Sequence, residues 1–312
     1  MFGFGILLTV ALFKTRSEAQ PGSFTEVTKG IWFREGNLML GHCNNTVIEM
    51  KDYLVVIDAN YPSGARAVME DIKKVSSKPV KYVFDTHHHG DHAYGNAVWT
   101  KAGATTLAYQ GVAEEMKRYE PARWRAEKRP DVNELNLSTA EPPQQTFNQN
   151  PFVLKDETRK IEFHFFGWAH TRGDGFAWLP TEKVLATGDA ATNGPYNYVA
   201  DANLGNWPKV MAAARKLDPQ LVLPGHGPRG GVEILKGQQL FFEETLKAVG
   251  AEIKKGKKLE DVVTFDGKKA QLTTIRIAEG ARKWVGNDFP GQVATFYKEL
   301  SQKTPAGDLP HN

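Results

Sequence analysis

Residues 86–92 read Thr-His-His-His-Gly-Asp-His (THHHGDH), which places four of the chain's nine histidines within six consecutive positions. This stretch directly follows residues 80–85, VKYVFD, whose β-branched and aromatic side chains predict a strand. Alternate residues of an extended segment point the same way, so His87 and His89 can face one point while His88 faces away. Beyond the turn at Gly90, Asp91 and His92 can face a second point nearby.

Such a cluster suits a metal site better than a hydrophobic core. Neutral imidazoles packed so closely leave many ring nitrogens without partners, and protonated imidazoles repel one another. Bound metal ions remove both difficulties. Imidazole nitrogen combined with carboxylate oxygen suits Zn²⁺, with iron or manganese as alternatives. His88, which faces away, is expected to pack beside the site and not to bind a metal.

Three further candidate ligands lie downstream, each at the end of an apolar run of β character. They are His170 in GWAHTRGD, Asp189 in VLATGDAA and His226 in LVLPGHGP. Each is next to a glycine or a tight turn. Proteins of the α/β class usually place their sites at the ends of strands, so these three side chains are expected to join the histidine cluster.

The pattern His87-x-His89-x-Asp91-His92, followed by His170, Asp189 and His226, resembles that of the metallo-β-lactamase-fold hydrolases. The resemblance covers roughly residues 25–230 and implies an αββα sandwich with a dinuclear zinc site between its sheets. It also implies ligand roles. His87, His89 and His170 would bind the first metal, Asp91, His92 and His226 the second, and Asp189 would bridge the two. By the same likeness, Asp58 is expected to hydrogen-bond near the site.

The resemblance further implies a zinc-dependent hydrolase, in which a hydroxide that bridges the two metals attacks a carbonyl. Asp91 and Asp189 are the candidate catalytic residues. Besides binding a metal, Asp91 can orient the hydroxide and take up its proton. The substrate would be a small ester, thioester, lactone or β-lactam. The alternatives are a phosphodiesterase on the same fold and an iron-dependent redox protein. This chain differs in two ways from the β-lactamases that bind zinc through His and Asp. Those enzymes normally do not use the aspartate at the position of Asp189 as a metal ligand, and they have Pro-Gly where this chain has Arg172-Gly173.

Four residues near the ligands are candidates for binding the substrate. The Arg172 guanidinium suits a carboxylate, although a salt bridge at the surface explains it equally well. Asn193, Tyr196 and Tyr198 follow Asp189 in TNGPYNY and are expected near the mouth of the site, where they can hydrogen-bond an oxyanion. The polar stretch 111–150 is either a lid over the site or an outer helix and loop.

The order of the expected elements indicates an α/β architecture with sheets inside and helices outside. Strands are expected at 31–33, 46–49, 53–58, 80–85, 105–110, 160–167, 175–189 and 220–228, and helices at 62–76, 95–102, 111–129, 206–217 and 232–255, with a loop at 130–151. One metallo-β-lactamase-like domain is expected over residues 24–231. Residues 232–312 are expected to form a helical C-terminal extension packed on it.

Composition narrows the function classes. The net charge of +3 among 312 residues predicts no nucleic-acid partner, and the single cysteine, Cys43, excludes a disulfide framework and a Cys-rich metal site. Residues 1–19 contain a short apolar run followed by Ser17-Glu18-Ala19, which indicates a signal peptide or an N-terminal anchor. We therefore expect an exported protein, periplasmic or secreted, with no stable membrane span unless this segment stays uncleaved. The sequence gives no indication of the oligomeric state.

Overall fold

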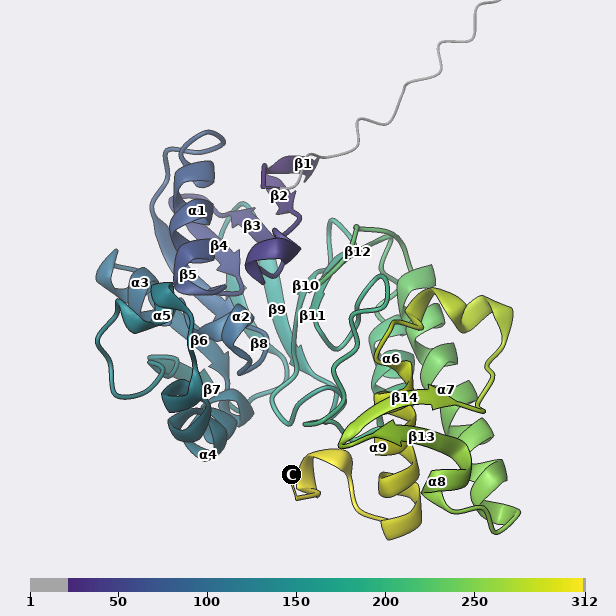
Figure 1. The fold of residues 1–312 in the computed structure, drawn as a ribbon. Helices are drawn as coiled ribbons and strands as arrows, with labels where there is room; N and C mark the ends of the chain where they lie inside the picture. The colour runs from purple at the N-terminus through teal and green to yellow at the C-terminus, as the bar shows by residue number, and fades with distance from the viewer. Residues whose placement is uncertain (1–21, 311–312) are drawn as a thin grey trace, which may run out of the picture.

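The computed structural model describes residues 22–310, which form two β-sheets packed face to face between layers of helices (Figure 1). The first sheet has seven strands in the order β1-β2-β3-β4-β5-β6-β7, and the second has five in the order β12-β11-β10-β9-β8. The αββα sandwich expected from the sequence is therefore confirmed. The expected signal segment, residues 1–19, lies outside the described residues.

The strands of the first sheet are β1 (Thr25–Thr28), β2 (Ile31–Arg34), β3 (Asn45–Glu49), β4 (Leu54–Ile57), β5 (Val80–Asp85), β6 (Thr105–Tyr109) and β7 (Gln145–Phe147). Those of the second are β8 (Phe152–Lys155), β9 (Lys160–Phe165), β10 (Gly175–Leu179), β11 (Val184–Gly188) and β12 (Leu221–Pro224). Pairing is parallel from β4 to β7 and between β11 and β12, and antiparallel elsewhere in both sheets.

Alternation along the strands divides the core into layers. In β4, Val55 and Ile57 point to the space between the sheets, whereas Leu54 and Val56 pack under helices of the outer layer. Helices cover both outer faces because both faces are apolar. They are α1 (Pro62–Ile72), α2 (Gly90–Ala93), α3 (Asn96–Lys101), α4 (Gln110–Ala126), α5 (Pro130–Asn133), α6 (Trp207–Arg215), α7 (Glu233–Lys254), α8 (Leu259–Val262) and α9 (Phe289–Gln302), with 3-10 turns at Leu38–Leu40, Glu279–Trp284 and Ala306–Asp308.

The C-terminal part, for which a helical extension was expected, contains helices α7, α8 and α9 and one additional feature. It contains a two-stranded hairpin, β13 (Val263–Asp266) and β14 (Lys269–Thr273), between α8 and α9. Its two-residue loop is Gly267-Lys268, because Asp266 pairs with Lys269, and Gly267 has a φ of +56°, a conformation that glycine adopts readily at the first central position of a hairpin turn. The expected loop at 130–151 also contains α5 and β7. Among residues 22–310, no helix combines the length and the apolar character needed to cross a membrane.

The strand ends that carry the candidate ligands meet at one edge of the sandwich. Strand β9 runs parallel to β11 and β12, because it pairs antiparallel with β10, which in turn pairs antiparallel with β11. The segments after these three strands therefore lie at the same edge of the second sheet. The backbone N–H of Gly175 donates to the carbonyl of Thr86 at 2.7 Å, which joins this edge to the end of β5 in the first sheet.

Candidate metal centre

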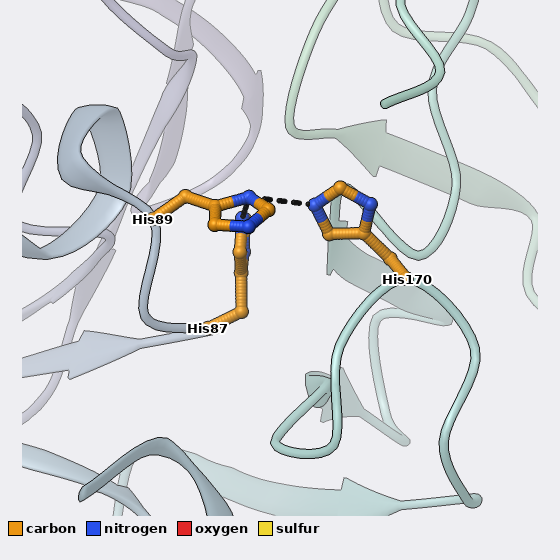
Figure 2. Close-up of side chains that lie close together, drawn as sticks. All are labelled: His87, His89 and His170. Carbon is orange, nitrogen blue, oxygen red and sulfur yellow. Dashed lines mark hydrogen bonds between the residues drawn. The ribbon is translucent and has the colours of Figure 1, made fainter. Parts of the chain in front are cut away.

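The first group of ligand atoms comes from the loop after β5 and the loop after β9. His87 Nε2 lies 3.1 Å from His89 Nδ1, which lies 2.9 Å from His170 Nε2, and the three rings converge as Figure 2 shows. His89 is the N-cap of the short helix α2 and still has extended backbone angles. The two-residue spacing of His87 and His89 therefore lets both imidazoles face His170, as the alternation predicted.

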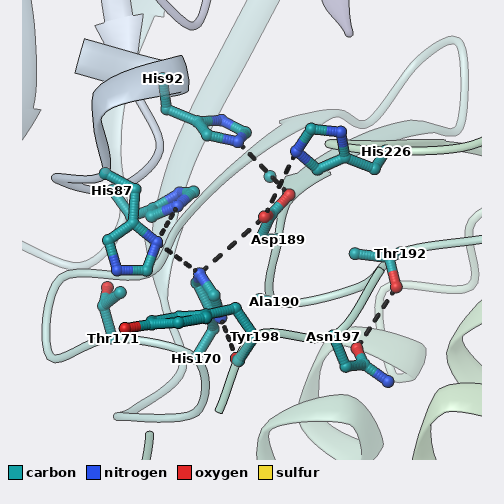
Figure 3. A network of polar contacts seen from close by, with 12 residues as sticks. His87, His92, His170, Thr171, Asp189, Ala190, Thr192, Asn197, Tyr198 and His226 are labelled. Carbon is teal, nitrogen blue, oxygen red and sulfur yellow. Dashed lines mark hydrogen bonds and ion pairs between the residues drawn. The ribbon is translucent and has the colours of Figure 1, made fainter. Parts of the chain in front are cut away.

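The second group lies beside the first. His226 Nε2 is 2.9 Å from Asp91 Oδ2, and His92 Nε2 is 3.4 Å from the same oxygen. Asp189 lies between the two groups (Figure 3): one of its oxygens is 3.4 Å from His92 Nε2, and the other is 3.6 Å from His226 Nε2 and 3.9 Å from His170 Nε2.

The residues present fit a pair of metal ions. We call His87, His89 and His170 the first triad, and Asp91, His92 and His226 the second triad. In each triad, one ligand atom per residue can be chosen so that the three chosen atoms lie within 4.8 Å of one another. Within the described residues, the buried Nε2 of His92 and Oδ1 of Asp189 have no hydrogen-bond partner. Buried polar atoms are seldom left unpaired, and a cation between them would pair both. The donor set of imidazole nitrogen and carboxylate oxygen is one that Zn²⁺ accepts.

Electrostatics keeps His87, His170 and Asp189 in the states that bind metals, whereas the adjacent carboxylates outweigh burial and raise the pKa of His92 and His226. Burial, together with the neighbouring imidazoles, lowers the pKa of His87 and brings that of His170 to about 3, so both stay neutral with a lone pair to donate. Burial alone would raise the pKa of Asp189, but the adjacent His226 and His92 outweigh it and hold this pKa at about 2. Asp189 is therefore a carboxylate at neutral pH.

Hydrogen bonds on the outer side of the rings set which nitrogen faces inward. His92 Nδ1 lies 2.9 Å from Asp58 Oδ2, which leaves Nε2 toward Asp189. The other oxygen of Asp58 accepts from the backbone N–H and the hydroxyl of Thr86 at 2.8 and 2.7 Å. The expected hydrogen-bonding role of Asp58 is thus present in the structure. Gly188, at a φ of +50°, is required here because a Cβ would lie 2.2 Å from the Thr86 hydroxyl.

A second supporting network was not foreseen from the sequence. Asp201 is buried, and its Oδ2 lies 2.7 Å from His89 Nε2, the nitrogen that points away from the other ligands. Arg123 in α4 donates from Nη2 to both oxygens of Asp201 at 2.8 Å, and its Nη1 lies 3.0 Å from His88 Nε2. His88 thus lies outside both triads, as expected, and contacts the helix that covers the site.

A cavity of about 640 Å³ opens over the two triads. Asp91, Asp189, His89 and His226 line its floor, and its walls include Tyr61, Tyr94, Glu120, Arg123, Glu127, Lys128, Tyr196 and Tyr198. Helix α4 therefore forms one wall of the cavity, which places part of the stretch 111–150 beside the ligands.

Two of the four residues expected to bind substrate lie at this cavity, Tyr196 and Tyr198. Asn193 does not line it, because its side chain is buried and donates to the Pro228 carbonyl at 2.6 Å. Arg172 does not line it either. Its guanidinium stacks on Trp168, 3.7 Å from the ring centroid, and forms an ion pair with Asp308.

Comparison with known proteins agrees with this architecture. A family model described as the metallo-beta-lactamase superfamily matches residues 38–226. The metallo-beta-lactamase type 2 of Bacteroides fragilis is 30% identical over 95 residues, which cover 28% of this chain and 37% of that protein. The 2,4-dinitroanisole O-demethylase subunit alpha of Nocardioides sp. (strain JS1661) is 24% identical over 213 residues, 67% of this chain and 59% of that subunit.

The chain thus spans less than two thirds of the length of either relative. Among solved structures, a metallo-beta-lactamase from Pontibacter korlensis aligns with a TM-score of 0.58 and 19% identity, over 71% of this chain and 98% of that chain. One from Hirschia baltica aligns with a TM-score of 0.57 and 22% identity, over 70% of this chain and 97% of that chain. These two likenesses concern the fold.

Proposed function

Because this chain belongs to the metallo-β-lactamase superfamily, we propose that it is a binuclear zinc hydrolase that cleaves a small ester, thioester, lactone or β-lactam. The observation that carries the proposal is the position of Asp189, whose oxygens lie within 4 Å of histidines of both triads. His87, His89 and His170 would hold the first ion, and Asp91, His92 and His226 the second. Asp189 would contact both.

When bound, zinc supplies a water with a pKa of about 7 and polarises a carbonyl oxygen. The protein's own residues arrange the rest. Asp91 lines the cavity, and its side chain is 23% exposed, which makes it more accessible than that of Asp189, the other catalytic candidate. The adjacent His92 and His226 outweigh the effect of burial and hold the pKa of Asp91 well below its usual range. Asp91 is therefore a carboxylate at neutral pH and can accept the proton of the attacking water on an oxygen.

The test combines metal analysis with a panel of substrates. Purified protein is expected to contain two zinc ions per chain and to hydrolyse a thioester, a lactone or a chromogenic β-lactam, with activity lost to a chelator and restored by zinc. Iron as the bound metal, or zinc without turnover of any of the three or of a simple ester, contradicts the proposal.

The Asp91→Asn variant tests the proton-accepting role. We expect kcat to fall by about 10²–10⁴-fold, the usual contribution of general acid–base catalysis. Zinc content is measured in parallel, because Asp91 is also a proposed ligand. Asp218→Asn is the matched control, since the Asp218 side chain is 73% exposed and pairs with Lys183 on the surface. Unchanged kcat in Asp91→Asn would exclude the role.

The similarity to an O-demethylase subunit over 213 residues favours a second candidate, the cleavage of an ether C–O bond. An activated methyl ether assayed for released methanol separates the two candidates. We also propose that the protein is exported, on the basis of the apolar run and the Ser17-Glu18-Ala19 site in residues 1–19. An N-terminus at Gln20 in the mature protein, read by mass spectrometry, tests this.

A further inference from the structure

The cavity over the triads is walled by tyrosines from two distant parts of the chain. Tyr61 and Tyr94 form one pair, with ring centroids 5.8 Å apart in an edge-to-face arrangement. Tyr196 and Tyr198 come from the loop after β11 and also line the cavity. Four aromatic rings around one opening give it flat, apolar surfaces with hydroxyls at their edges.

Two of these rings lie directly against candidate ligands. The Tyr198 ring is 5.3 Å from that of His89, in the first triad, and the Tyr196 ring is 5.9 Å from that of His226, in the second. Figure 3 shows Tyr198 beside His170. A group attached to a carbonyl held at the triads would therefore lie against tyrosine.

The charged side chains of the cavity wall cancel one another. Arg123 is paired with Asp201, which lies behind His89. Glu120 accepts a hydrogen bond from the Tyr94 hydroxyl, and Glu127 and Lys128 are neighbours at the rim. Apart from the candidate ligands, the wall thus holds two acidic and two basic side chains, Glu120 and Glu127 against Arg123 and Lys128. The wall therefore favours an uncharged group over a carboxylate.

We propose that the substrate is a neutral ester or related acyl compound that carries an aromatic ring next to the reacting carbonyl, held between these tyrosines. This proposal rests on the proposed hydrolase function and adds the class of substrate. Rings prefer edge-to-face or offset-stacked contacts with tyrosine, which a saturated ring of similar size cannot make.

The test compares two esters that differ only in this ring, methyl phenylacetate and methyl cyclohexylacetate, which share a leaving group. We expect kcat/KM of the zinc-loaded enzyme to favour the phenyl compound by about twofold to tenfold. Tyr198→Leu should bring the ratio close to one, and Tyr198→Phe should retain it. The Tyr198 side chain is half exposed, so its replacement leaves the core intact.

Tyr53→Leu is the matched control, because Tyr53 pairs with Tyr82 and is not among the residues that line the cavity. Its ratio should equal that of the unmodified enzyme. If both esters are hydrolysed equally well, or if Tyr198→Leu keeps the phenyl preference, the aromatic proposal is wrong while the hydrolase proposal stands.

A binding measurement separates the two proposals if neither ester is cleaved. Calorimetric titration of the zinc-loaded protein with phenylacetamide and cyclohexylacetamide, which keep the carbonyl but resist hydrolysis, should show tighter binding of the phenyl amide. Loss of this difference in Tyr198→Leu supports the aromatic site even without turnover, whereas equal binding of the two amides by the unmodified protein overturns it.

Discussion

Replacing Asp201 by asparagine should weaken zinc binding at the first triad without touching any ligand. The Asp201 carboxylate, fully buried, accepts from His89 Nε2 at 2.7 Å and twice from Arg123 at 2.8 Å. By holding the proton on Nε2, it leaves His89 Nδ1 to face His87 and His170. An amide at this position carries no charge and can present a donor to His89 instead of an acceptor. Loss of such a supporting partner typically costs about 10–100-fold in metal affinity or activity.

The same change also removes the charged partner of Arg123. Hydrogen bonds to charged groups contribute about 1.5–3 kcal/mol, and the Arg123 side chain is 30% exposed, so water replaces part of the loss and we expect about 1–2 kcal/mol of destabilisation. Competitive titration of zinc against a chromophoric chelator measures the affinity, and thermal unfolding measures the stability. Asp218→Asn serves as the surface control. Zinc affinity in Asp201→Asn equal to that of the control would falsify the argument that Asp201 orients His89.

Two further predictions concern stability. In α7, a Cβ at Gly237 would lie 1.9 Å from the Trp284 ring, whereas a Cβ at Gly250 would have nothing within 4 Å. Gly237→Ala should therefore lower the Tm, and Gly250→Ala should stabilise the protein by about 0.8–1 kcal/mol through helix propensity. A higher Tm for Gly237→Ala would contradict the packing of Trp284 against this helix. Burial raises the pKa of Glu115 from its ordinary 4.5 to about 7, so its contribution to stability is full below pH 4.5 and is lost as the pH rises through about 7. Glu115→Gln should lessen the fall in Tm between about pH 5 and about pH 8, which thermal unfolding scans at each pH measure. If Tm falls with pH equally in Glu115→Gln and in the unmodified protein, Glu115 is not the source of this pH dependence.

The two directions in which the side chains of the histidine loop point could be predicted from the sequence because they depend on local rules, whereas the grouping of this loop with His170, Asp189 and His226 rested on the resemblance to the metallo-β-lactamase-fold hydrolases. Alternation in an extended segment separates His87 and His89 from His88, and glycines mark the turns that follow the strands. The order of strands and helices along the chain predicts sheets that are covered by helices. These features involve residues within a few positions of one another, and the structure bears them out.

Only the tertiary structure decided which side chains support or surround the ligands. Asp201 follows His89 by 112 positions and Arg123 lies in a charge-rich helix, so nothing local distinguishes either from a solvated surface residue. Arg172 shows the converse, because its spacing from His170 suggested the cavity while Asp308, 136 positions away, holds it elsewhere. The energy of a buried charge depends on what lies within a few ångströms in space, and chain folding, which brings distant segments together, determines that neighbourhood.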